Sequence, residues 1–237
     1  MSTTQPRVQS GLEREVRRIL KAADDARRGG RREGDEVRPL GKKARRTRAA
    51  LLTSAFESFT ARGYRNTSVQ DIHEGAGVSL GTFYQYFREK ADVMSTLVAE
   101  SVIRSSESMF PSLSVNDGSD GPRRVIEGFV RNYAASADFV RVWEEVTQIE
   151  PSVADFRYRV SRILDSGIEH AIIEGQASGA VDAALDPAVA ARALAAMVDR
   201  YCYITFVVEA RRDEATIDDA IAVLTRLWTN ALGLASP

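Results

Sequence analysis

Side chains suited to contacting another molecule gather between residues 67 and 90. They are hydroxyl, amide, aromatic and basic groups: Ser79, Thr82, Tyr84, Gln85, Tyr86 and Lys90. Hydroxyl and amide groups can hydrogen-bond to the base edges and phosphates of DNA. Lys90 can pair with a phosphate alongside the first amides of the helix that it opens. This stretch therefore indicates recognition of nucleic acid.

Two short helices with a glycine turn between them must hold these side chains. Thr67 followed by Gln70 matches a capping box at the start of the first helix. Gly77 permits the positive φ of a sharp turn, and Ser79 is a natural N-cap for the second helix. Apolar residues give each helix an inward face: Val69, Ile72 and Ala76 on the first, Val78, Phe83 and Phe87 on the second. The second helix is thus predicted to be held from behind while its polar side faces outward.

The sequence shows no pattern that indicates catalysis. Glu144 and Glu145 are neighbours, so on a helix they point in different directions and form no acid–base pair. His73, His170 and Cys202 are isolated and lack metal-ligand spacing. There is no glycine-rich phosphate loop and no serine nucleophile elbow. We therefore expect no metal, no cofactor and no enzymatic activity.

An ordered set of residues between about 45 and 95 resembles the TetR family of bacterial transcriptional repressors. The set runs from the first helix to the start of the fourth: Ala55, Phe56, Phe59, Gly63, Tyr64, Thr67, Ser68, Val69, Asp71, Ile72, Ala76, Gly77, Val78, Ser79, Gly81, Thr82, Phe83, Tyr84, Tyr86, Phe87 and Lys90. The resemblance implies that Thr67 or Ser68 contacts phosphate and that the second short helix reads the major groove. It also implies that Tyr86 and Lys90 hold the DNA backbone.

Basic residues ahead of the first helix add to this surface, because they can reach the DNA backbone or the minor groove. The predicted DNA-binding residues are Arg45, Arg46, Thr67, Ser68, Ser79, Leu80, Gly81, Thr82, Tyr84, Gln85, Tyr86 and Lys90.

The charge distribution along the chain agrees with a DNA-binding N-terminal part. Residues 1–48 hold 15 Lys and Arg against 7 Asp and Glu, whereas residues 97–237 hold 13 against 21. This asymmetry indicates a basic end that faces DNA and an acidic body, although the net charge is only −1.

Composition and cysteine usage indicate the compartment. The 237 residues are 44% hydrophobic and 27% charged, which is ordinary for a soluble globular protein. The single cysteine, Cys202, cannot form an intrachain disulfide. No signal peptide and no apolar run of about 18 residues is apparent. We expect a soluble, cytoplasmic protein with no membrane partner.

The chain is predicted to be all-α, with an N-terminal three-helix helix-turn-helix domain joined to a helical ligand-binding and dimerisation domain. Residues 1–40 form a basic extension, partly helical or disordered, whose role is open among a DNA-gripping arm, a docked helix and a solvated tail. Residues 41–91 form the helix-turn-helix domain, and residues 92–237 form the effector-binding and dimerisation domain.

The family resemblance implies a homodimer that pairs through its last two helices, and a palindromic operator requires this two-fold symmetry. It also implies a small-molecule effector held between the middle helices. Large apolar side chains that could line such a pocket are Met94, Met109, Phe110, Phe129, Tyr133, Trp143, Phe156 and Tyr203, and they favour a lipophilic effector. The predicted function is an operator-binding repressor released by this effector. The alternative is a helical DNA-binding or interaction protein without an effector.

Overall fold

The computed structural model describes residue 18, residues 41–109, residue 115 and residues 118–234. The predicted basic extension therefore lies outside the described residues except at position 18, as do Phe110 and the side chain of Met109. Within the described part, every regular element is a helix and no strand occurs, which confirms the predicted all-α class.

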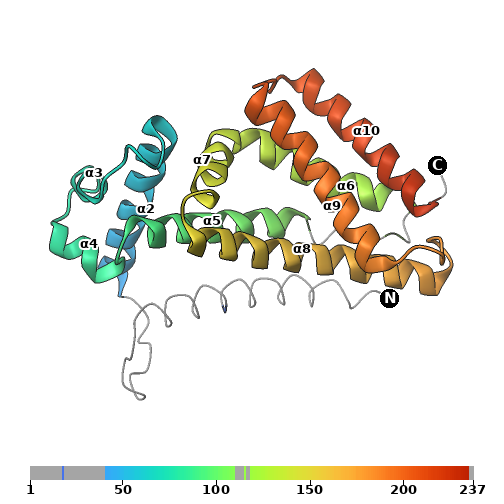
Figure 1. The fold of residues 1–237 in the computed structure, drawn as a ribbon, viewed down its shortest axis with the longest axis horizontal. Coiled ribbons are helices and arrows are strands. Elements are labelled where there is room, and N and C mark those ends of the chain that lie inside the picture. The colour runs from blue at the N-terminus through green and yellow to red at the C-terminus, as the bar shows by residue number, and fades with distance from the viewer. Residues whose placement is uncertain (1–17, 19–40, 110–114, 116–117, 235–237) are drawn as a thin grey trace, which may run out of the picture. The chain divides into compact units, whose positions relative to one another are not determined.

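Helices follow one another with short connections (Figure 1). They are α2 (Lys42–Arg62), α3 (Val69–Gly75), α4 (Leu80–Tyr86), α5 (Lys90–Met109), α6 (Asp120–Ala135), α7 (Ala137–Thr147), α8 (Pro151–Ser178), α9 (Pro187–Cys202), the π-helix η3 (Tyr203–Val208) and α10 (Glu214–Leu232). None of the described helices is long and apolar enough to cross a membrane.

Contacts divide the described residues into two compact units. The N-terminal unit contains residues 41–101 together with 141–157, and the C-terminal unit contains the described residues of 102–140 and 158–234. Residues 92–101 thus pack with α2, α3 and α4. The functional boundary that the sequence predicts after residue 91 stays a prediction.

The core of the N-terminal unit forms behind the two short helices. α2 ends at Gly63, whose φ of 82° permits the chain to leave the helix while its amide donates to the Phe59 carbonyl at 2.9 Å. The inward face of α2 consists of Leu51, Leu52, Ala55 and Phe59. Phe56, which belongs to the set of residues that carries the family resemblance, is 42% exposed, because it lies off the buried stripe.

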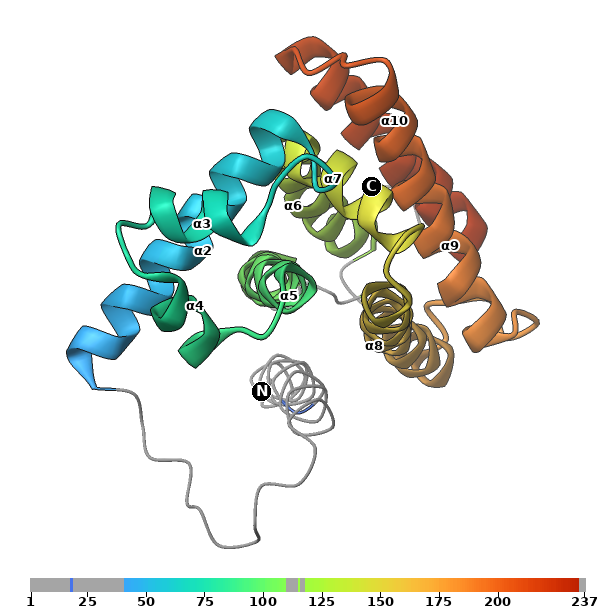
Figure 2. The same cartoon turned by 60° about the vertical axis from the view of Figure 1, so that its left-hand side comes forward.

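The C-terminal unit is a layered helical bundle in which α9 and α10 run side by side in opposite directions (Figures 1 and 2). Asp186 caps α9 by accepting a hydrogen bond from the Val189 amide at 2.9 Å, and Pro187 occupies the first helical position. The core of the bundle takes side chains from α6, α8, α9 and α10, among them Ile126, Ile172, Leu194, Leu224 and Trp228.

Candidate DNA-binding surface and ligand pocket

The start of α3 is fixed by Ser68 and Asp71. The Ser68 hydroxyl oxygen accepts from the Asp71 amide at 3.1 Å, and the Ser68 amide donates to Asp71 Oδ2 at 2.7 Å. Hydrogen bonds from the Ser68 hydroxyl and then from its amide lower the pKa of Asp71 to about 2. The capping box that the sequence assigned to Thr67 and Gln70 is therefore shifted by one residue.

Thr67 lies inside the unit rather than at its surface. Thr67 is only 1% exposed, and its hydroxyl donates to the Gly63 carbonyl at 2.9 Å. This contact closes the loop between α2 and α3. Ser68 is exposed at the N-terminus of α3, so of the two predicted phosphate contacts only Ser68 presents a side chain to solvent.

The turn between α3 and α4 is rigid because its polar groups are hydrogen-bonded. Gly77 has φ 66°, and its amide donates to the Glu74 carbonyl at 2.9 Å. The Val78 amide donates to the His73 carbonyl at 3.0 Å, and the His73 ring Nδ1 lies 2.9 Å from the Val78 carbonyl oxygen. The direction in which α4 leaves the turn is therefore set by local bonds.

α4 is capped at its start and anchored from behind. The Ser79 hydroxyl oxygen accepts from the Thr82 amide at 3.2 Å. Phe83 is fully buried and Phe87 is 5% exposed, and their rings lie 5.9 Å apart. The opposite side of the helix faces solvent with four of the predicted residues: Leu80, Gly81, Tyr84 and Gln85. Thr82 and Tyr86 are half-buried.

Lys90 is held by the protein itself. Its ammonium donates to the Tyr64 carbonyl at 2.8 Å and to the Thr67 carbonyl at 3.0 Å, and it lies 4.2 Å from the centre of the Tyr64 ring. Burial lowers the pKa of Lys90. In this structure the lysine joins the start of α5 to the loop before α3, which is a positioning contact rather than an extended arm.

Tyr64, which contacts Lys90, also bonds to the residue just before α8. It is 1% exposed, and its hydroxyl donates to Glu150 Oε1 at 3.0 Å. Burial, and next the hydrogen bond to Glu150, raise the pKa of Tyr64 well above its ordinary value. The sequence did not predict this link, because Tyr64 and Glu150 are 86 residues apart.

The two predicted arginines at the start of α2, Arg45 and Arg46, are both exposed.

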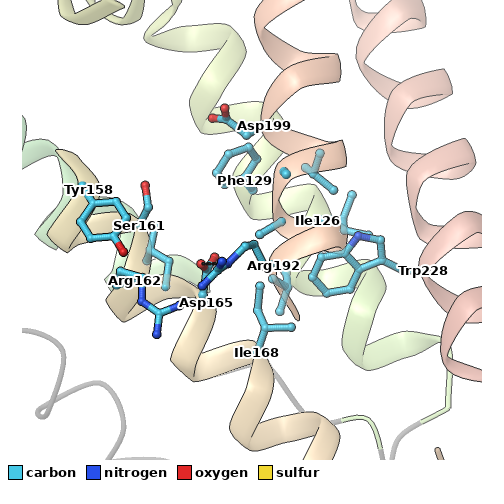
Figure 3. Close-up of a pocket in the computed structure, with 15 residues that line it drawn as sticks. Ile126, Phe129, Tyr158, Ser161, Arg162, Asp165, Ile168, Arg192, Asp199 and Trp228 are labelled. Atoms are coloured by element: carbon cyan, nitrogen blue, oxygen red, sulfur yellow. Dashed lines mark ion pairs between the residues drawn. The ribbon is translucent and has the colours of Figure 1, made fainter. Parts of the chain in front are cut away.

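The C-terminal unit contains a cavity of about 360 Å³ between α6, α8, α9 and α10 (Figure 3). This volume lies within the range of small-molecule pockets, roughly 300–1,000 Å³. Most of its lining is apolar, with Ile126, Phe129, Ile168 and Trp228 among the walls. Charged side chains of the lining come from Arg162 and Asp165 on α8 and from Arg192 and Asp199 on α9.

Phe129 is the predicted pocket residue that lines this cavity. Tyr133 and Tyr203 pack in or against the hydrophobic core of the same unit, and Met94 and Phe156 are buried in the core of the N-terminal unit. Trp143, also in the N-terminal unit, is half-buried with the guanidinium carbon of Arg157 5.2 Å from its ring centre. Met109 and Phe110 lie outside the described side chains. The prediction of pocket residues from the sequence did not include the charged lining, because it was based on large apolar side chains.

A short helix that ends in a tight glycine turn, followed by a second helix with an exposed polar face, defines a helix-turn-helix DNA-binding regulator. The model of the family "Bacterial regulatory proteins, tetR family" matches residues 51–97, so this part of the chain is similar to the DNA-binding region of that family.

Two curated relatives and one solved structure are similar to this chain. The regulator TcmR of Streptomyces glaucescens is 32% identical over 90 residues, which is 38% of each chain. The uncharacterised regulator YhgD of Bacillus subtilis is 26% identical over 184 residues, covering 75% of this chain and 92% of YhgD. The structure of Salmonella enterica GusR superposes with a TM-score of 0.67 at 20% identity, over 83% of this chain and 100% of GusR. The likeness to GusR shows the fold alone.

Proposed function

We propose that this transcriptional regulator is a repressor that binds a palindromic operator as a homodimer and is released by a small molecule. The observation that carries the proposal is the exposed face of α4, where Leu80, Gly81, Tyr84 and Gln85 project from a helix fixed by Ser79. Such a helix can enter a major groove without rearrangement. The protein acts where operator DNA is, in the cytoplasm.

The predicted DNA contacts divide into exposed residues that can touch DNA and buried ones that position them. Tyr84, 54% exposed, and Gln85 offer an aromatic ring, a hydroxyl and an amide to base edges or phosphates. Ser68 offers a hydroxyl and the amides of a helix N-terminus to phosphate. Arg45 and Arg46 add salt-dependent attraction. Lys90 and Thr67 contribute by holding the loop before α3 in place.

Dimerisation is supported by apolar side chains left exposed on the last helices. They are Val189, Tyr201, Ile204, Val208, Val223 and Leu227. Residues 201, 204 and 208 recur at helical spacing along the end of α9 and η3, and residues 223 and 227 do so on α10. Two adjacent helices with apolar stripes can pair with their copies as a four-helix bundle, which removes those stripes from water.

Release by an effector is supported by the cavity, whose walls include residues of α8. Residues 158–178 of this helix belong to the C-terminal unit, whereas residues 151–157 belong to the N-terminal unit, next to Glu150 and its bond to Tyr64. A ligand that binds better when α8 is displaced would shift the population toward a state that fits the operator less well. The cavity favours this function over a DNA-binding protein without an effector.

Operator binding is tested with duplex fragments from the DNA beside the coding region, by electrophoretic mobility shift and fluorescence anisotropy. Tyr84→Ala should lower the affinity about tenfold to hundredfold, as expected for loss of a contact of ~1–3 kcal/mol. The matched control is Ile173→Ala, since Ile173 is 46% exposed but lies on α8 and outside the lining of the cavity. The control should bind the fragment like the wild type. Equal affinity of the wild type and Tyr84→Ala would contradict the proposal.

A further inference from the structure

Asp165 is a largely buried carboxylate whose charge is only partly compensated by its neighbours. Its side chain is 14% exposed and lines the cavity from α8 (Figure 3). Within the described part of the chain Asp165 makes a loose ion pair, with Arg192 Nε 3.9 Å from Oδ2. That arginine side chain is 61% exposed. Burial raises the pKa of Asp165, although the positive charges of Arg192 and Arg162 act in the opposite direction. Among the described residues no hydrogen bond to its carboxylate occurs.

Aromatic side chains form part of the remaining lining of the cavity. Trp228 is 2% exposed, and its indole N–H has no hydrogen-bond partner among the described residues. Phe129 and Tyr158 add two more aromatic rings to the lining. Aromatic faces attract cations that approach within about 6 Å. The walls thus combine a largely desolvated anion with aromatic rings.

A positively charged ligand fits these walls better than a negatively charged one. A carboxylate in the cavity would approach Asp165 and meet like charge in a medium that screens poorly. The guanidinium groups of Arg162 and Arg192 belong to exposed residues, so water weakens their repulsion of a cation. An ammonium group at Asp165 would supply the hydrogen bonds that the carboxylate lacks. Arg192 would remain on the solvent-exposed side of the carboxylate.

We infer, as an extension of the proposed repressor function, that the effector is an apolar molecule carrying a protonated amine and that Asp165 is its counter-ion. The aromatic and aliphatic walls take the apolar body. Asp199 also lines the cavity, but it already has an interaction of its own, so Asp165 is the better candidate for the anchor.

The test uses three probes that share a flat bicyclic body: naphthylmethylamine, naphthalenemethanol and naphthoic acid. Their affinities for the full-length protein are measured by isothermal titration calorimetry at neutral pH without DNA. The amine should bind about tenfold or more tightly than the alcohol, which is the smaller end expected for a charge-assisted hydrogen bond. The acid should bind more weakly than the alcohol.

Asp165→Asn keeps the side-chain shape and removes the charge, so it should bring the affinity for the amine down to that for the alcohol. Asp199→Asn is the matched control, because it removes a charge from another wall of the same cavity. This variant should keep the preference for the amine. Circular dichroism melting curves establish that both variants are folded, and the comparison of probes on the wild type does not depend on either variant.

Three results would overturn the inference: no binding of the amine to the wild type, tighter binding of the acid, or an amine preference that survives Asp165→Asn. Operator binding of the ligand-free wild type is measured separately. A wild type that binds the amine but no operator would contradict the repressor function alone. A wild type that binds its operator but prefers the acid would contradict the ligand class alone.

Discussion

Replacing Gly75 by alanine should disturb the contact that sets α3 against α2. A Cβ atom at residue 75 would lie 2.4 Å from the Ser54 hydroxyl oxygen but 3.5 Å from Ser54 Cβ. Ser54 is 6% exposed, and its hydroxyl donates to the Ile72 carbonyl at 2.8 Å. The added methyl therefore collides with a single atom, and that atom is engaged in a buried hydrogen bond.

The expected cost follows from how the collision is relieved. Rotating the Ser54 hydroxyl away forfeits its bond and leaves a buried polar group unpaired, which costs about 1–3 kcal/mol. Alanine recovers up to about 1 kcal/mol through its higher helix propensity, and less at the last residue of α3. Gly75→Ala should therefore lower the free energy of unfolding by about 1–2 kcal/mol. Misplacement of α3 should also weaken operator binding.

A second substitution tests the cause. In the double variant Gly75→Ala, Ser54→Ala, the new methyl meets Ser54 Cβ at 3.5 Å, an ordinary van der Waals distance. Urea unfolding of the wild type, both single variants and the double variant then gives a coupling energy. We expect the double variant to be more stable than the sum of the single effects by about 1 kcal/mol. Single effects that add within about 0.5 kcal/mol would refute the reasoning.

Three further predictions concern the cluster around Tyr64, the cap of α3 and the proposed subunit interface. Tyr64→Phe keeps the buried ring but loses the bond to Glu150, so the free energy of unfolding measured in urea should fall by about 1–2 kcal/mol; a wild-type value would contradict the link. The folded-state pKa of Asp71 is depressed, so its stabilisation is present above pH 3.8 and should be lost as the pH falls toward about 2. Acid unfolding of Asp71→Asn should lack this component, and an unchanged acid profile would count against it. Leu227→Arg should convert a dimer into a monomer in size-exclusion chromatography with light scattering, and should bind the operator more weakly; a dimeric variant would exclude this part of α10 from the interface.

Features set by neighbouring residues could be predicted from the sequence. The stop at Gly63, the cap at Ser79 and the Asp186–Pro187 start depend on local bonds and backbone angles, and all three occur in the structure. The cap of α3 was misplaced because Thr67 and Ser68 both carry hydroxyls that can cap. The choice is made by tertiary contacts, since the Gly63 and Ser58 carbonyls accept the Thr67 hydroxyl bonds.

The pocket was largely beyond prediction for a different reason. Helical spacing tells which residues face inward, but it does not tell which inward residues meet a partner and which border a void. Met94 and Phe129 both fit the apolar pattern, yet Met94 is fully buried in packed core while Phe129 borders the cavity. Asp165 could have been noticed in the sequence, because it is a charged residue three positions before Ile168, on the inward side of a long helix. A charged residue at such a position marks either a buried pair or a site.

α8 gives the proposed release a physical route. Asp165 lies within this helix, and Glu150 directly precedes its first residue, Pro151. The main-chain hydrogen bonds of a helix make it stiff along its axis, so a shift imposed at residue 165 is carried to its start with little loss. At that start, Glu150 accepts the bond from Tyr64, and the Tyr64 carbonyl accepts one from Lys90. Lys90 also holds the Thr67 carbonyl immediately before the cap of α3. In the proposed release, a small displacement of α8 would therefore act through these bonds on the loop before α3.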